Sequence, residues 1–216
     1  MLYLLTGDVQ TGKTRWLQKL IEELEANSVT PYGVIAPGRW IEHQSDTTLR
    51  FEKIGIDNEL LPQHELVPFA RRASDVGDDE TQLACSQAHK AQLGWAIDDN
   101  ALERVNEHLA WVARFTADGS KTQQNGTGRR KALLVIDELG RLEILHGNGL
   151  VNGLALVERG ATPALPHALV IVREQLLKQA KTHFANAPWG GMQAILPTRE
   201  AHDLLFMQLR IESDAT

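Results

Sequence analysis

Residues 7–14 combine two glycines, a lysine and two threonines in a fixed spacing, Gly-Asp-Val-Gln-Thr-Gly-Lys-Thr. The spacing fits the pattern G-x-x-x-x-G-K-[ST], in which glycines let the backbone curl until successive N–H groups point inward at an anion. The first turn of a following helix adds its own unpaired N–H groups and the positive end of its dipole. The chemistry that these residues could perform is therefore the binding of phosphate groups.

The flanking sequence predicts the elements that such a loop needs. Residues 2–6 favour a strand, and an amphipathic pattern from Lys13 to about Ala26 predicts a helix. Lys13 would reach the β- and γ-phosphates of a nucleotide, and the Thr14 hydroxyl would hold Mg²⁺. The alternative is an ordinary turn with an exposed lysine. The residues expected to surround the phosphates are Gly7, Asp8, Val9, Gln10, Thr11, Gly12, Lys13 and Thr14.

Two carboxylates follow an apolar run later in the chain. Residues 132–136 read Ala-Leu-Leu-Val-Ile, the pattern of a strand that is buried on both faces of a parallel sheet. Asp137 and Glu138 come next, at the carboxyl end of this strand, where open α/β sheets bind their ligands. We expect Asp137 to hold Mg²⁺, directly or through water, and Glu138 to orient and polarise an attacking water. Alone, such a run usually marks only a strand that meets a loop, and the first motif favours the functional interpretation.

The composition indicates a single domain spanning residues 1–216. The chain has 216 residues, of which 43% are hydrophobic and 23% charged, enough for a sizeable core. The net charge of −6 argues against nucleic acid as the main partner. Cys85 is the only cysteine, so no disulfide forms within the chain, and we expect a cytoplasmic protein. We expect no membrane contact, because the sequence shows neither a signal peptide nor an apolar stretch of spanning length.

Strands and helices alternate along the rest of the chain, as in an α/β fold with a mainly parallel sheet. Residues 38–70 look rich in β-structure, with a break at Leu60-Leu61-Pro62, and are interpreted as a hairpin-like excursion on the sheet. The polar segments 71–92 and 117–130 are expected to be surface loops. The other predicted strands cover residues 32–36, 132–137, 168–172 and 192–196. The other predicted helices cover residues 101–115, about 149–158, from 174 onward, and 197–211.

Residues 137–143, Asp-Glu-Leu-Gly-Arg-Leu-Glu, resemble the segment D-E-[IL]-G-[KR]-[ML]-E of the cancer-related nucleoside-triphosphatase family of small P-loop NTPases. Residues 33–38 are similar to the family's G-x-x-x-P-G turn, and residues 170–174 to its strand that ends in arginine. The resemblance covers nearly the whole chain. It implies a three-layer RecA-like fold with strand order 5-1-4-3-2 and a catalytic glutamate beside the Mg²⁺ aspartate. The implied activity is slow hydrolysis of nucleoside triphosphates with loose base preference.

Some positions depart from this pattern or leave two interpretations open. Gln10 stands where the family usually has glycine, which suggests a different loop conformation or a weaker grip on phosphate. Arg173 lies on the ligand side of the sheet and is either an arginine finger in cis or a surface ion-pair partner. Arg141 is a weaker candidate for the same role. Glu143 either supports Mg²⁺ or the water, or is a carboxylate at a helix N-terminus.

The histidines show no metal-ligand spacing and are interpreted as surface or structural residues. The tryptophans favour packing, although Trp40 could flank a nucleotide. We expect a monomer that takes ATP, GTP or other triphosphates with Mg²⁺ as cofactor. A protein partner could bind through residues 71–92 or 117–130.

Three classes of function fit the sequence. The favoured one is a stand-alone nucleoside-triphosphatase. The second is a nucleoside or nucleotide kinase, which would need an acceptor pocket and usually an arginine-rich lid. The third is a nucleotide-dependent switch or binding protein with slow turnover. The glutamate after Asp137 favours water as the acceptor and therefore favours the first class.

Overall fold

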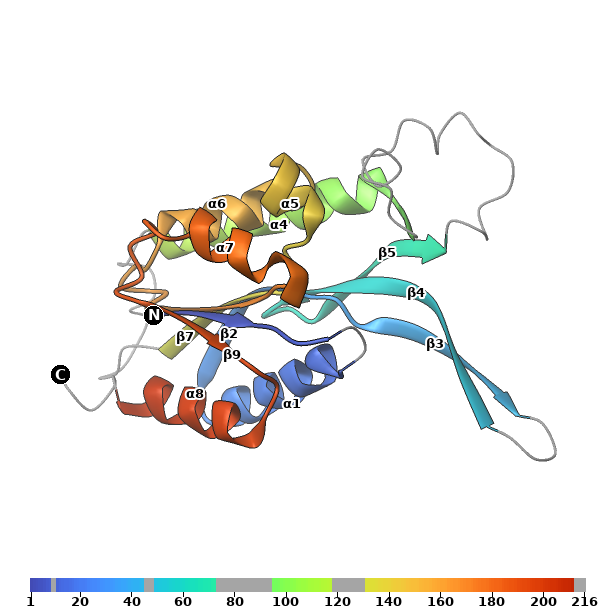
Figure 1. Ribbon diagram of the computed structural model, residues 1–216, viewed down its shortest axis with the longest axis horizontal. Coiled ribbons are helices and arrows are strands. Elements are labelled where there is room, and N and C mark those ends of the chain that lie inside the picture. The colour runs from blue at the N-terminus through green and yellow to red at the C-terminus, as the bar shows by residue number, and fades with distance from the viewer. Residues whose placement is uncertain (9–10, 45–48, 73–94, 118–130, 212–216) are drawn as a thin grey trace.

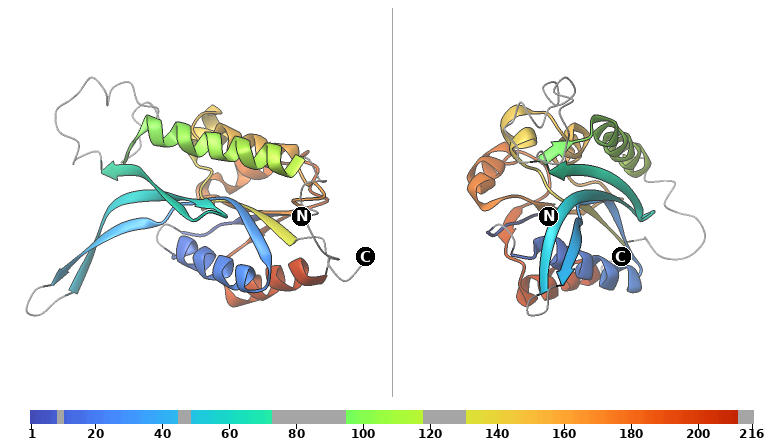
Figure 2. Two further views of the ribbon diagram at one scale, coloured as in Figure 1. Left: turned by 180° about the vertical axis from the view of Figure 1, so that it is seen from behind. Right: turned by 90° about the vertical axis from the view of Figure 1, so that its right-hand side faces the viewer.

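The computed structural model describes residues 1–8, 11–44, 49–72, 95–117 and 131–211. Strands from this part of the chain form one sheet with helices on both of its faces (Figures 1 and 2). The strands are β1 (Leu2–Leu5), β2 (Val29–Ile35), β3 (Gly38–Gln44), β4 (Leu49–Leu61), β5 (Glu65–Arg72), β6 (Trp95–Ile97), β7 (Lys131–Ile136), β8 (His167–Ile171) and β9 (Met192–Ile195). The helices are α1 (Lys13–Ala26), α4 (Asp99–Ala117), α5 (Arg141–His146), α6 (Val151–Arg159), the 3₁₀ turn η2 (Glu174–Leu176), α7 (Leu177–His183) and α8 (Arg199–Ile211).

One half of the sheet is parallel and has the spatial order β2-β7-β8-β1-β9. Numbered along the chain, these five strands have the order 5-1-4-3-2 that the family resemblance implies. The predicted fold class is therefore confirmed. Since the carboxyl ends of parallel strands share one edge, the loop after β1 and the carboxylates after β7 lie at the same edge, with β8 between them.

Alternate residues of the central strands pack against opposite helical layers. On β1, Leu2 and Leu4 belong to the core cluster on the side of α4 and α6, whereas Tyr3 and Leu5 belong to the cluster with α1 and α8. The residues of β7 divide between the two clusters in the same way. Burial on both faces explains why these strands appear in the sequence as unbroken apolar runs.

The other half of the sheet is antiparallel and begins at β4, which pairs with the end of β2 from Gly33↔Leu61 to Ile35↔Glu59. β4 pairs with β5 along its inner part, β6 follows β5, and β3 pairs with the outer part of β4. β3 and the outer part of β4 extend away from the body as a two-stranded ribbon (Figures 1 and 2). We call residues 38–44 and 49–56 the β3–β4 ribbon. The predicted excursion after the second strand is thereby confirmed.

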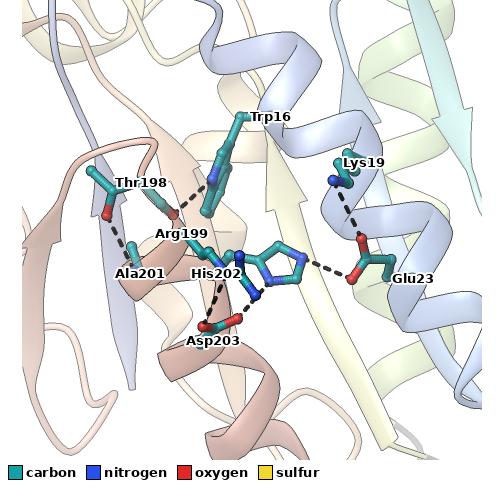
Figure 3. A network of polar contacts seen from close by, with 8 residues as sticks. All are labelled: Trp16, Lys19, Glu23, Thr198, Arg199, Ala201, His202 and Asp203. Carbon is teal, nitrogen blue, oxygen red and sulfur yellow. Dashed lines mark hydrogen bonds and ion pairs between the residues drawn. The ribbon is translucent and has the colours of Figure 1, made fainter.

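Polar contacts join α1 to α8 on one face of the sheet (Figure 3). The indole Nε1 of Trp16 donates to the carbonyl of Thr198, at 3.0 Å, and the Thr198 hydroxyl accepts from the backbone N–H of Ala201. His202 lies 3.1 Å from the Glu23 carboxylate and meets the Trp16 ring edge-on. These contacts place α8 beside α1, the helix that follows the loop after β1.

The antiparallel half departs most from the sequence prediction. β2 begins at Val29, three residues before the predicted strand, and β5 and β6 were not predicted as separate strands. β5 carries Pro68 and three charged residues, and β6 has three residues only, so neither shows a clear apolar alternation. Such strands are stabilised by their neighbours rather than by a local pattern.

The predicted loops overlap strand and helix ends. Arg71 and Arg72 belong to β5, and the rest of segment 71–92 lies outside the described residues. Ala117 is the last residue of α4, and the rest of segment 117–130 also lies outside them. The helix that was expected from about residue 149 begins at Val151, and the short α5 was anticipated only through one interpretation of Glu143. These differences lie at element ends, where local patterns are weakest.

Candidate active site

The loop between β1 and α1 places glycines where other residues are disfavoured. Gly7 has φ 136° and Gly12 has φ 81°, both in the region that costs energy for a residue with a side chain. Gly12 caps α1 without a side-chain hydrogen bond, so the first-turn N–H groups of the helix are left for a ligand. Val9 and Gln10 lie outside the described residues, and the effect expected from Gln10 stays a prediction.

Lys13 is folded back over this loop. Its Nζ donates to the carbonyl oxygens of Gly7 at 2.8 Å and of Asp8 at 2.6 Å. The Thr11 hydroxyl oxygen lies 3.5 Å away from the same ammonium. Carbonyl oxygens carry only partial charge, so a phosphate in the loop would offer the ammonium stronger, charge-assisted hydrogen bonds. The lysine is thus held beside the position where the motif requires it.

Asp137 is buried next to Thr14. The residue is 4% exposed, its carboxylate accepts a hydrogen bond from the backbone N–H of Ala36 at 3.2 Å, and the nearby Thr14 side chain favours its charged form. Burial raises the pKa of Asp137 to about 6, although the hydrogen bond from Ala36 acts in the opposite direction. The structure therefore brings Thr14 near Asp137, and these are the two residues predicted to hold a metal ion. The charge of the buried Asp137 carboxylate is poorly solvated.

Glu138 and Arg173 are paired with each other. The Arg173 Nε donates to Glu138 Oε1 at 2.5 Å, and both side chains are partly exposed to solvent. Arg173 follows β8 and Glu138 follows β7, adjacent parallel strands whose ends lie side by side. The peptide bond between Asp137 and Glu138 is cis. The sequence predicts a role for Glu138 and a role for Arg173 separately. The contact between the two side chains appears only in the structure.

The two interpretations of Glu143 are distinguished by its contacts. Its Oε2 accepts from the backbone N–H of Gly140 at 2.8 Å, and its Oε1 accepts from that of Leu150 at 2.9 Å. Burial raises the pKa of Glu143, and these two hydrogen bonds act against the rise. The carboxylate thus closes the start of α5 and the loop before α6, as expected of a helix N-terminal residue. Arg141 is exposed at the first position of α5.

Lys53 enters the site from β4 and has no counterpart among the predicted residues. Burial lowers the pKa of its ammonium, while the charges of Asp137 and Glu138 raise it and that of Arg173 lowers it further. These interactions place Lys53 within electrostatic reach of all three side chains. No local pattern singles out this residue, because one lysine in an alternating strand looks like any solvent-exposed position.

Three further expectations concern residues and segments outside this group. Among the described residues there is no cluster of three or more histidine, cysteine, aspartate or glutamate side chains that could hold a metal ion. Trp40 is 46% exposed and lies opposite Lys53 on the ribbon. The search for long apolar helices, restricted to the described residues, finds none that could cross a membrane.

Comparison with models of known protein families gives no match, and no curated protein sequence matches this chain. Two solved structures are similar to it. The crystal structure of THEP1 from the hyperthermophile Aquifex aeolicus has a TM-score of 0.53 at 15% sequence identity, over 97% of this chain and 96% of that one. The solution structure of a human cancer-related nucleoside triphosphatase has a TM-score of 0.51 at 16% identity, over 100% and 98% of the two chains.

The similarity extends over both halves of the sheet, because each solved structure is covered almost completely. At this level of identity it establishes a shared fold. The order of the parallel strands and the glycine-containing loop after β1 agree with that result. The chain therefore has the P-loop NTPase fold of these two proteins.

Proposed function

We propose that this chain hydrolyses nucleoside triphosphates to diphosphates and phosphate, and that it belongs to the cancer-related nucleoside-triphosphatase family that its sequence resembles. The observation that carries the proposal is the meeting of Thr14 with the buried Asp137, beside a loop covered by Lys13. A triphosphate held by that loop would have its terminal group next to Glu138. The names of the two similar structures support the same activity.

The residues fit a magnesium ion. Mg²⁺ prefers oxygen ligands and usually takes one or two protein side chains together with phosphate oxygens and waters. The Thr14 hydroxyl and the Asp137 carboxylate provide such oxygens, and the buried charge of Asp137 would be stabilised by a cation. When bound, the ion would neutralise part of the charge on the phosphates.

The protein side chains would divide the remaining tasks. Lys13 would leave the carbonyls of Gly7 and Asp8 and bind the phosphates, since its present partners are weaker acceptors. Glu138 would orient the attacking water, and Arg173 would fix the position of the Glu138 carboxylate or turn to the γ-phosphate. Catalysis of this kind depends on positioning and on stabilisation of charge rather than on a covalent step of the protein.

The test is phosphate release from ATP, GTP, CTP and UTP with Mg²⁺ by the wild type and two variants. Lys13→Ala is expected to lose binding or turnover, because the loop then has no ammonium for the phosphates. Glu138→Gln is expected to keep nucleotide binding and lose turnover, by on the order of a hundredfold or more. Release from several of the nucleotides is the result expected for loose base preference.

Two exposed positions provide matched controls. Lys19→Ala removes a lysine from the outer face of α1, and Glu103→Gln removes a carboxylate from α4. Both variants should hydrolyse at the wild-type rate. Triphosphate binding without phosphate release by the wild type would contradict the proposal and favour a kinase that lacks its acceptor or a switch. Normal hydrolysis by Glu138→Gln would show that the assignment of Glu138 is wrong.

A further inference from the structure

Lys53 is a cation that has no task in the mechanism described above. In the order of the strands it lies on one side of Asp137 and Glu138, and the loop after β1 lies on the other. Lys53 lies on β4, which is separated from β7 by β2, whereas the loop follows β1 on the other side of β8. Asp137 and Glu138 therefore stand between two lysines, Lys13 and Lys53. A terminal phosphate beside these carboxylates would be approached by Lys13 from the loop and by Lys53 from the antiparallel half of the sheet.

The backbone between β2 and β3 determines where Lys53 lies. Ala36, the first residue of this segment, donates its N–H to the Asp137 carboxylate, and the N–H of Asp137 donates to the carbonyl of Val34 near the end of β2. The next residues enter β3, which pairs with β4 so that Trp40 lies opposite Lys53. The lysine thus lies opposite a strand that begins only a few residues after the backbone bonded to Asp137.

Gly38 leaves the space that the lysine stem occupies. A Cβ at this position would come within 2.7 Å of Lys53 Cε and within 3.3 Å of its Nζ. The ammonium also lies 5.4 Å from the centre of the Trp95 ring, a distance at which the ring attracts a cation. Lys53 also lines a groove of about 540 Å³ on the side of the ribbon, together with Trp40, Phe51 and Arg72.

The charges around Lys53 leave it available. Three nearby arginines are paired with carboxylates, Arg173 with Glu138, Arg39 with Asp57 and Arg72 with Glu52. Among the described residues Lys53 has no such ion pair, and its recorded contact is the aromatic ring of Trp95. If Asp137 bound a metal ion and Glu138 bound a water, the phosphate groups would be the main negative charge facing the half-buried Lys53 ammonium.

We propose that Lys53 binds the γ-phosphate of the nucleotide from the β3–β4 ribbon side and thereby distinguishes a triphosphate from a diphosphate. This inference rests on the proposed function and adds to it the residue that recognises the terminal phosphate. A diphosphate would still be held by the loop and Lys13, and would leave Lys53 in its position over Trp95.

The experiment compares the binding of a triphosphate and a diphosphate of the same nucleoside, both with Mg²⁺, in the wild type and in Lys53→Met. Methionine keeps the apolar stem and removes the charge. We expect triphosphate affinity to fall by about tenfold or more, the usual size of a lost charged hydrogen bond, while diphosphate affinity stays constant. Turnover should fall as well, and Lys53→Arg should restore part of both properties.

Arg50→Met is the control, because Arg50 is an exposed cation three residues further out on the same strand. It should leave binding and turnover unchanged, and thermal melting will establish that each variant is folded. An unchanged preference for triphosphate in a folded Lys53→Met would overturn the inference while leaving the hydrolase proposal intact. If the wild type binds triphosphate without hydrolysing it, the hydrolase proposal fails, and the two affinities still decide the role of Lys53.

Discussion

Single side chains in this site are held by partners that a bound nucleotide would replace or use. Lys13 is bonded to the carbonyls of its own loop, and Asp137 to the backbone of Ala36. Only Glu138 already has a full charge as its partner, the guanidinium of Arg173. A phosphate bound in the loop would therefore compete with the loop carbonyls for Lys13.

Arg173→Ala tests whether this arginine acts through Glu138. We expect turnover to fall by on the order of a hundredfold, the usual effect of losing one charge-stabilising donor. The double variant with Glu138→Gln distinguishes the two roles, as measured by phosphate release. If Arg173 only positions Glu138, the double variant will be no slower than Glu138→Gln alone. A further loss of rate in the double variant would indicate that Arg173 contacts the phosphate itself.

Glu143→Ala tests the structural role of the buried carboxylate. The change leaves the N–H groups of Gly140 and Leu150 without their acceptor, so we expect a loss of about 1–3 kcal/mol in the free energy of unfolding. Urea denaturation measures this loss, and Leu145→Ala on the exposed side of α5 is the control. Turnover per folded molecule should stay constant. Greatly reduced turnover in a stable protein would mean that Glu143 takes part in the reaction.

At the scale of elements, α4 is joined to the boundary between the two halves of the sheet by His108. Its Nε2 lies 3.1 Å from the carbonyl oxygen of Gly33 and 3.0 Å from that of Leu61, so this nitrogen carries the proton and donates. Burial lowers the pKa of His108 below its ordinary value of 6.5, and the two hydrogen bonds and the charge of Glu65 oppose the shift. The helix is therefore fixed to paired residues of β2 and β4 by a neutral imidazole.

This arrangement gives a pH dependence of known sign. Because the folded state binds the proton of His108 less readily than the unfolded chain, this residue makes stability fall as the pH drops below 6.5. His108→Asn removes the group, so the stability difference between wild type and variant should shrink as the pH is lowered from 8 towards 5. Urea denaturation across this range measures it. A constant difference would show that the imidazole does not titrate with a lowered pKa.

Gly33 shows how closely the adjacent strands β2 and β7 approach each other. This residue has φ 126°, and a Cβ here would overlap the carbonyl oxygen of Val135 on β7. Neither the backbone conformation nor the close approach accepts a side chain. β2 pairs with β7 on one side and with β4 on the other, so this glycine lies where the phosphate-binding half and the ribbon-bearing half join.

At the scale of the whole molecule, the outer end of the β3–β4 ribbon packs little against the body. Its large apolar side chains Trp40, Ile41, Leu49 and Phe51 are exposed, and Figures 1 and 2 show it extending beyond the helical layers. The ribbon's inner end, in contrast, pairs with β5 and carries Lys53. Both stability and the proposed phosphate contact are therefore expected to depend on the inner end of the ribbon rather than on its outer end.

Replacing residues 42–51 by a two-residue Asn-Gly turn, between the paired residues Ile41 and Glu52, removes the outer end of the ribbon and keeps its inner end. Such a turn connects antiparallel strands directly, so the pairing of Trp40 with Lys53 can be kept. We expect the free energy of unfolding to change by only about 0.5 kcal/mol, as for other exposed positions, and phosphate release to continue. Chemical denaturation and the release assay measure both. A stable but inactive product would mean that the outer ribbon itself belongs to the site.

The sequence alone determined the parts of this protein that depend on short spacings. Residues 7–14 and the apolar run before Asp137 predicted the loop, the buried strand and their meeting at one edge of a sheet, and the family resemblance implied the order of the parallel strands. These signals are local, since a turn needs its glycines and a strand buried on both faces needs a continuous apolar run.

Only the tertiary structure decided which side chains meet at that edge. Glu138 and Arg173 are 35 residues apart in the sequence, and Ala36 and Asp137 are 101 apart. Lys53 is brought towards the carboxylates because β4 pairs with β2, a long-range pairing between strands whose own patterns are weak. Strand pairing of this kind is set by the burial of whole faces and by neighbouring strands rather than by local residues, so no short stretch of the sequence encodes it.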